Sequence, residues 1–221
     1  MLLAKKKAEE PPAPPPPKRS GAFLFALLVS ITVSQLMFLN IASFLPLHIK
    51  ENNLFIESTE LGVILAMYQV ARLLLSTTIG GTMQKVGRKN YIMIGFVLLI
   101  ISTVGFALIG YVDTEYGWLF FASAIVLRFV QGIGGTCLQV SSYSIILSEF
   151  ATKREVGLAY LSAARGLGFL GGPLSGQLFY TAVGYVWTFV IFSIIMGVTL
   201  VFSYFALPVS LNANLNKTKA A

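Results

Sequence analysis

The stretch Val156–Leu207, VGLAYLSAARGLGFLGGPLSGQLFYTAVGYVWTFVIFSIIMGVTLVFSYFAL, decides the fold. Its 52 residues are almost all apolar, and as one helix they would measure about 78 Å, whereas the hydrocarbon core of a bilayer is about 30 Å thick. The stretch must therefore fold back on itself. Gly184 permits a tight reversal, so we place the break at residues 181–184, between the spans Val156–Tyr180 and Tyr185–Leu207.

Four similar segments precede this pair of spans: Gly21–Leu47, Glu60–Thr82, Tyr91–Val112 and Trp118–Ser148. Hydrophobic residues make up 56% of the chain, above the roughly 45–50% of soluble proteins, and charged residues only 11%. Helices satisfy their own backbone polar groups in lipid. The sequence therefore predicts an all-α membrane protein with six transmembrane helices within residues 21–207. An enzyme is not expected, because the lone His48 has no nucleophile or metal-ligand cluster beside it.

The distribution of basic residues predicts the orientation. With six spans, both termini share one side of the membrane, and that side holds Lys5, Lys6, Lys7, Lys18, Arg19, Lys85, Arg88, Lys89, Lys153, Arg154, Lys217 and Lys219, whereas the opposite loops hold only Lys50. The positive-inside rule then puts both termini in the cytosol. Residues 1–20 are predicted to be a disordered, basic, proline-rich cytosolic arm, and residues 208–221 a polar cytosolic tail. A nucleic-acid partner is not expected, because the basic residues lie in short loops.

The loop between the second and third spans contains Gly80, Gln84, Lys85, Gly87, Arg88 and Lys89. Gly87 permits a sharp turn, and the two basic residues after it can meet the partial negative charge of helix C-termini. The spacing resembles the signature loop of the major facilitator superfamily, which reads glycine, three residues, aspartate, a basic residue, any residue, glycine, arginine and a basic residue. Gln84 stands in the place of the aspartate. The resemblance implies that this loop forms a cytosolic gate.

The fourth span carries a polar stripe. Arg128, Gln131, Gly135, Gln139 and Ser142 fall within about 80° of one helix face, and polar groups inside a bilayer must face protein or water. The run from Arg128, with glutamine three residues later and glycine after it, is similar to the fourth-helix motif of the same family. The resemblance implies that its arginine lies in the transport cavity.

The fifth span carries Gly168, Gly172, Pro173 and Gly176, and small residues spaced by four allow helix backbones to approach closely. This spacing is similar to the fifth-helix motif of antiporter branches, with Gln177 in place of the last glycine. Together with the Gly-Tyr step at Gly184, it looks most like the vesicular amine and polyamine transporter branch.

The resemblance implies one six-helix half with a 3+3 inverted repeat, which moves a small organic solute by alternating access, with proton antiport as a candidate coupling. Such a half needs a second six-helix half, a homodimer or a larger membrane complex. The third and sixth spans, the least polar, are expected to face lipid. No cofactor or metal is expected. The expected substrate path consists of Gln35, Asn40, Tyr68, Arg72, Arg128, Gln131, Gln139 and Arg165.

Three of these path residues raise a charge problem. Arg72, Arg128 and Arg165 lie mid-span at an insertion cost of about 3 kcal/mol each, and no Asp or Glu lies deep in a predicted span. An anionic solute, carboxylates from another chain or half, and water with snorkelling side chains can each compensate. The lack of membrane carboxylates also favours an alternative function, a non-transporting structural or assembly subunit of a larger membrane complex. The solute, the coupling ion and the membrane stay open.

Overall fold

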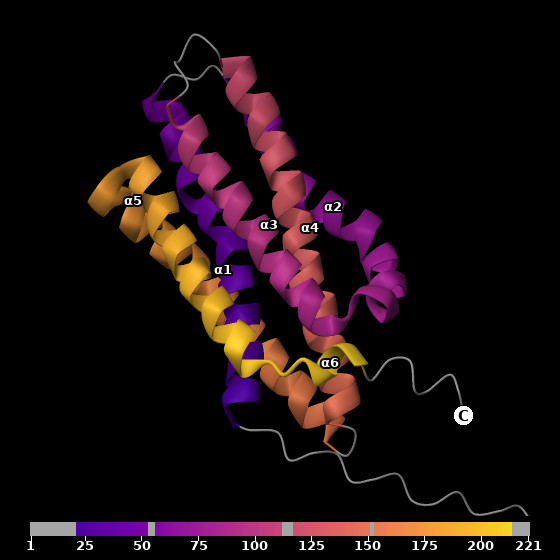
Figure 1. Cartoon of the computed structure of the whole chain (residues 1–221). Coiled ribbons are helices and arrows are strands. Elements are labelled where there is room, and N and C mark those ends of the chain that lie inside the picture. The colour runs from indigo at the N-terminus through magenta and orange to yellow at the C-terminus, as the bar shows by residue number, and fades with distance from the viewer. Residues whose placement is uncertain (1–20, 53–55, 112–116, 151–152, 214–221) are drawn as a thin grey trace, which may run out of the picture.

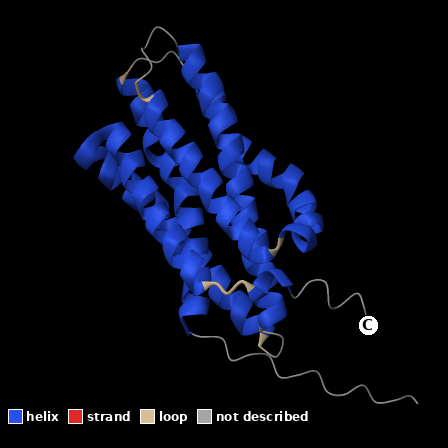
Figure 2. Cartoon of the chain, in the orientation of Figure 1, coloured by secondary structure: helices blue, strands red, loops and turns tan. Residues whose placement is uncertain are grey.

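The computed structural model describes residues 21–52, 56–111, 117–150 and 153–213, and the secondary structure of these residues is entirely helical (Figures 1 and 2). The helices are α1 (Gly21–Glu51), α2 (Ser58–Val86), α3 (Arg88–Ile109), α4 (Gly117–Glu149), α5 (Arg154–Ala206) and α6 (Ser210–Ala213). The first five are long and apolar enough to cross a membrane. Their ends lie within a few residues of the predicted spans. The predicted arm at residues 1–20 and the tail after residue 213 lie outside the described residues.

Helix α5 contains the predicted reversal. Its 53 residues are interrupted at Gly184, whose φ of 81° and ψ of 179° are not helical. The chain turns back at one end of the bundle (Figure 1). The arms on either side pack against each other, with the rings of Phe179 and Phe192 in edge contact at a centroid distance of 5.4 Å. A Cβ on Gly184 would meet nothing within 4 Å, so the positive φ, and not crowding, selects glycine here.

Glycines bring the first arm of α5 into backbone contact with α1. A Cβ on Gly172 would lie 2.8 Å from the carbonyl oxygen of Leu36, and a Cβ on Gly176 would lie 2.7 Å from that of Asn40. Gly168 is equally close to α1, and Pro173 lies between these glycines inside α5. We call Gly168, Gly172 and Gly176 the glycine contact. It shows the close helix approach predicted for small residues spaced by four.

The beginning of α1 and the end of α5 lie at the same end of the bundle, which we call the α6 end (Figure 1). Ser30 of α1 and Ser203 of α5 share a hydrogen bond of 3.0 Å, and the rings of Phe25 and Phe202 make edge contact. The opposite end, which carries Gly184, is called the Gly184 end. The two described chain ends thus lie at the same end of the bundle (Figure 1).

The expectation that the third span faces lipid stays a prediction: α3 exposes apolar side chains such as Ile101 and Leu108 along one side and is buried along the other. In the most apolar part of α3, 44% of the residues are buried, against 22% in α2. Helix α3 is sandwiched between α4 and α5, where Gly95 packs against the backbone of Gly134. Helix α2 packs mainly along α4 and exposes Leu73 and Leu74 on its other side. The apolar residues of α3 therefore serve both the core and an exposed face.

Candidate functional site

Arg128 is fully buried at the middle of the bundle, and main chain and side chains of the protein surround its charge. Its Nη1 donates to Oε1 of Gln131 at 2.7 Å, and both terminal nitrogens lie 3.3 Å from the carbonyl oxygen of Phe38 on α1. The guanidinium carbon is 5.5 Å from the ring centroid of Tyr68 and 5.8 Å from that of Phe38. Arg128 therefore ties α4 to α1 and α2 without a carboxylate among these contacts.

Further buried polar atoms of α1 and α4 have no hydrogen-bond partners among the described residues. They are both side-chain polar atoms of Gln35, Oδ1 of Asn40, Nε2 of Gln131 and the hydroxyls of Ser141 and Ser142. An unpaired buried polar group costs about 1–3 kcal/mol. We call these groups the polar band, which extends along α4 from Gln131, one turn from Arg128, to Ser141 and Ser142, about 20 Å from Arg128 along the helix axis.

Arg72 and Arg165 lie beside the polar band, in contact with open space. Arg72 of α2 donates to Oε1 of Gln139 and, at 3.1 Å, to Oε1 of Gln69. Arg165 of α5 lies with its guanidinium carbon 5.2 Å from the ring centroid of Phe169. A cavity of about 370 Å³ separates α2, α4 and α5 here, with Arg72, Gln139 and Arg165 in its wall.

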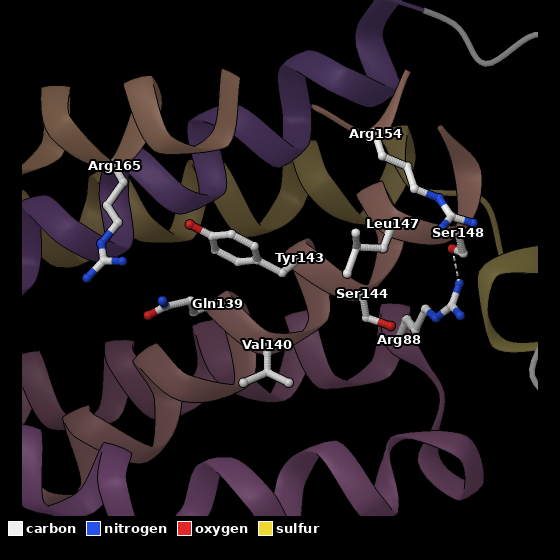
Figure 3. Close-up of a pocket in the computed structure, with 9 residues that line it drawn as sticks. All are labelled: Arg88, Gln139, Val140, Tyr143, Ser144, Leu147, Ser148, Arg154 and Arg165. Atoms are coloured by element: carbon white, nitrogen blue, oxygen red, sulfur yellow. Dashed lines mark hydrogen bonds between the residues drawn. The ribbon is translucent and has the colours of Figure 1, made fainter. Parts of the chain in front are cut away.

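A larger cavity of about 920 Å³ extends from this point toward the α6 end, mainly between α4 and α5 (Figure 3). Gln139, Val140 and Arg165 line both cavities, so the two adjoin. The wall of the larger cavity is made of Arg88, Gln139, Val140, Tyr143, Ser144, Leu147, Ser148, Arg154 and Arg165. Its volume is that of a typical site for a small organic molecule.

The expected path residues thus fall into two groups. Arg72, Gln139 and Arg165 line the cavities, whereas the other five, which are fully buried, lie in or against the polar band: Gln35, Asn40, Tyr68, Arg128 and Gln131. Sequence reasoning missed Tyr143, Ser144, Ser148 and the cavity role of Arg154. The run of hydroxyl side chains at residues 141–144, SSYS, is the sequence feature that could have indicated Tyr143 and Ser144.

The expected gating loop divides at Gly87. Gly80, Gln84 and Lys85 are exposed near the end of α2, whereas Gly87, Arg88 and Lys89 are buried. Gly87 has a φ of 97°, and a Cβ on it would lie 2.5 Å from Cγ of Asn212, so both conformation and space require glycine.

The two basic residues after Gly87 fasten the start of α3 to the ends of other helices. Arg88 donates to the hydroxyl of Ser148 in the last turn of α4, and Nζ of Lys89 donates to the carbonyl of Tyr204 near the end of α5 at 2.8 Å. The main-chain nitrogen of Lys89 donates to Oδ1 of Asn212 at 2.9 Å. The predicted polar tail therefore begins with residues that pack on the bundle, including the fully buried Leu211.

The described carboxylates all lie at or beside helix ends. They are Glu51, Glu57, Glu60, Glu149 and Glu155. None of these lines either cavity, although Glu149 lies close enough to Arg88 to interact with its charge. Within the described part of the chain, the polar band and the cavities are thus neutral or cationic.

Long apolar helices around a buried polar band define a multi-pass integral membrane protein. The family model of the Major Facilitator Superfamily matches residues 24–221, and the chain belongs to this family. The predicted family and the predicted multi-pass membrane location are thereby confirmed.

Several curated relatives support the branch suggested by the fifth span. The synaptic vesicular amine transporter of Mus musculus is 30% identical over 137 residues, which cover 61% of this chain and 25% of that protein. The chromaffin granule amine transporter of Homo sapiens is 33% identical over 130 residues, or 58% of this chain and 23% of the relative. Multidrug resistance protein 3 of Bacillus subtilis (strain 168) is 29% identical over 127 residues, or 57% and 23%. The chain thus matches about a quarter of the length of these curated relatives.

Proposed function

We propose that this chain is a secondary transporter domain that moves a small organic solute across a membrane by alternating access. The observation that carries the proposal is a pair of adjoining cavities that extends from the α6 end inward. The 920 Å³ cavity begins beside Arg88 and Arg154 and reaches Gln139 and Arg165, where it adjoins the 370 Å³ cavity beside Arg72. Family membership and the names of the relatives support the same function.

The proposed topology is one half of a facilitator-type transporter, with six crossings in a 3+3 arrangement and the α6 end in the cytosol. The break at Gly184 supports two crossings within α5, and the basic residues at the α6 end support its orientation.

The half is proposed to work against a second six-helix half, a second copy or another membrane subunit. Gln69 is exposed on α2, and Arg72 on the same helix is half-buried beside the smaller cavity. Polar and charged groups at membrane depth face protein or a water-filled space, not acyl chains. A covering partner on this side of α2 and α5 satisfies that requirement.

Proton antiport is the proposed coupling, supported by the spacing of Gly168, Gly172, Pro173 and Gly176, which resembles the fifth-helix motif of antiporter branches. Because the described carboxylates lie at or beside helix ends, the proton-binding group is assigned to the partner half. The same observation favours the second candidate function, a non-transporting structural or assembly subunit.

Flux measurements on the reconstituted full chain separate the two functions. Proteoliposomes with an imposed pH gradient are assayed for saturable uptake of three solutes of equal length: adipate, 1,6-diaminohexane and 1,6-hexanediol. Gln131→Leu, in the polar band, is expected to reduce uptake, whereas Gln177→Leu, a half-buried glutamine of α5 outside both cavities, is expected to leave it unchanged. No saturable uptake of any solute, together with co-purification in fixed stoichiometry with other membrane proteins, would establish the structural subunit instead.

A further inference from the structure

The larger cavity has two cationic poles with an apolar wall between them. Figure 3 shows Arg88 and Arg154 around Ser148 at one end, and Arg165 beside Gln139 at the other. Gln139 and Ser148 are nine residues apart on α4, which is about 14 Å along the helix axis. Val140, Tyr143 and Leu147 line the space between the poles, and the Tyr143 hydroxyl points toward Arg165 in Figure 3.

Positive charge exceeds negative charge around this cavity. Arg88, Arg154 and Arg165 line it directly, and Arg72 of the adjoining cavity is near enough to Arg165 for the two like charges to repel. Glu149 offsets part of the charge of Arg88, and Glu155 follows Arg154 in the first turn of α5. Even with both glutamates counted against the four arginines, the surroundings remain cationic, and an anion placed here is attracted by all four guanidinium groups.

Part of the donor capacity of the wall is unused. The Nε of Arg165 has no hydrogen-bond partner among the described residues, whereas Arg88 already donates to the hydroxyl of Ser148. Guanidinium groups bind carboxylates and phosphates through paired N–H donors, and the hydroxyls of Tyr143 and Ser144 are further donors in the same wall. A cationic amine would instead meet arginines at each pole without a carboxylate in the lining.

We propose that the cavity between α4 and α5 binds an elongated organic anion whose carboxylate or phosphate groups meet Arg88 and Arg154 at one pole and Arg165 at the other. The apolar middle of the ligand lies along Val140, Tyr143 and Leu147. The inference deepens the proposed function and rests on it for its transport meaning, because it names the class of solute that this half receives. The binding itself requires no transport.

Titration calorimetry on the purified full chain in neutral, lipid-free detergent tests the proposal with three probes of similar length. Adipate carries two negative charges, hexanoate one, and 1,6-diaminohexane two positive charges. Adipate is expected to bind more tightly than hexanoate, and the diamine is expected not to bind. Arg165→Gln and Arg154→Gln each remove one charge and are expected to weaken adipate binding about tenfold, the usual effect of losing a hydrogen bond to a charged group.

Lys153→Gln is the matched control, because Lys153 is exposed, adjoins Arg154 and lies outside the cavity wall. Thermal unfolding of each variant without ligand establishes that the protein is folded. Adipate binding to the wild-type chain in nanodiscs distinguishes a soluble anion from a lipid headgroup. If the site binds a lipid headgroup, phosphatidylglycerol in the nanodisc is expected to displace adipate, and neutral phosphatidylcholine is not.

If adipate binds to the wild-type chain, binds more weakly to both arginine variants and is not displaced by lipid, the ligand is a soluble anion. If phosphatidylglycerol displaces adipate and both arginine variants bind adipate more weakly, the same site takes a lipid headgroup as its ligand. Three results would overturn the proposal. The diamine could bind as tightly as adipate, the two arginine variants could bind adipate no more weakly than Lys153→Gln does, or neither adipate nor phosphatidylglycerol could bind. Adipate binding without flux would contradict only the proposed transport function.

Discussion

The two ends of the bundle differ in what lies between their helices. At the Gly184 end, Phe44 packs against Tyr180, Tyr185 and Phe189, with ring centroids 5.3–6.0 Å apart. His48 adds a further ring, stacked on Tyr185 at 3.9 Å. At the α6 end, a cavity lined by arginines lies between α4 and α5. Aromatic rings pack against one another in the first region, whereas long cationic side chains line open space in the second. The comparison teaches that the two ends of the described bundle are built differently, one around packed rings and the other around a cavity.

Cysteine labelling gives the largest expected contrast between the two ends. In a Cys137→Ala background, which removes the chain's one cysteine, Ser144→Cys in the cavity wall is expected to react with a membrane-impermeant maleimide at least about tenfold faster than Thr188→Cys near the Gly184 end. Thr188 is fully buried, so its reaction requires local opening. Mass spectrometry of the labelled chain measures both rates. Equal rates would remove the distinction between a packed position at the Gly184 end and an accessible one in the cavity wall.

Truncation of the aromatic packing is expected to cost the most stability. Phe44→Ala removes a fully buried ring from the Gly184 end and should lower the free energy of unfolding by about 3 kcal/mol. The matched control is Phe205→Ala, because Phe205 is 80% exposed and its loss should change stability by less than about 0.5 kcal/mol. Reversible unfolding in mixed micelles provides the measurement. If Phe44→Ala lowers the free energy of unfolding no more than Phe205→Ala does, the aromatic packing does not stabilise the Gly184 end.

Gly87→Ala tests how the α6 end is held together. The positive φ and the closeness of Asn212 should together lower stability by about 2 kcal/mol. Gly80→Ala is the control, because a Cβ there meets nothing and alanine is favoured inside a helix. Addition of Asn212→Ala should recover part of the loss, since it removes the nearest atoms. If the double variant loses as much stability as Gly87→Ala, the whole loss is due to the positive φ of residue 87 and not to the contact with Asn212.

Asn212→Ala alone is expected to have the smallest effect. It removes the hydrogen bonds to the main chain of Lys89 and to Asn90, and should cost about 1 kcal/mol. Ser210→Ala, at an exposed position of the same short helix, is the control. Hydrogen exchange at the start of α3 should rise only in Asn212→Ala. Unchanged exchange would show that α6 lies on the bundle without securing it.

Length and hydropathy predicted most of the fold. The 52-residue apolar stretch cannot cross a bilayer once, and the structure breaks it at Gly184 as expected. Sequence could not predict that α3 is more enclosed than α2, because hydropathy does not distinguish an apolar residue facing protein from one facing lipid. Nor could it predict Asn212 on the start of α3, a contact between residues distant in sequence.

The candidate site was predicted in part. Helical periodicity places Gln139 on the same stripe as Arg128 and Gln131, and in the structure Gln139 lines a cavity while the other two are fully buried. It could not tell which stripe residues line open space and which lie packed against α1. The sequence assigns Arg154 only to the basic residues that orient the chain in the membrane, whereas in the structure the first turn of α5 brings it to the cavity beside Arg88.

The glycine contact has a mechanical consequence. Because the backbones of α1 and the first arm of α5 touch at three successive turns, displacing one helix along the other would break main-chain contacts at each turn. A side chain larger than hydrogen at any of the three positions would force the two helices apart. The hydrogen bonds from Arg128 to the carbonyl of Phe38 connect this helix pair to α4.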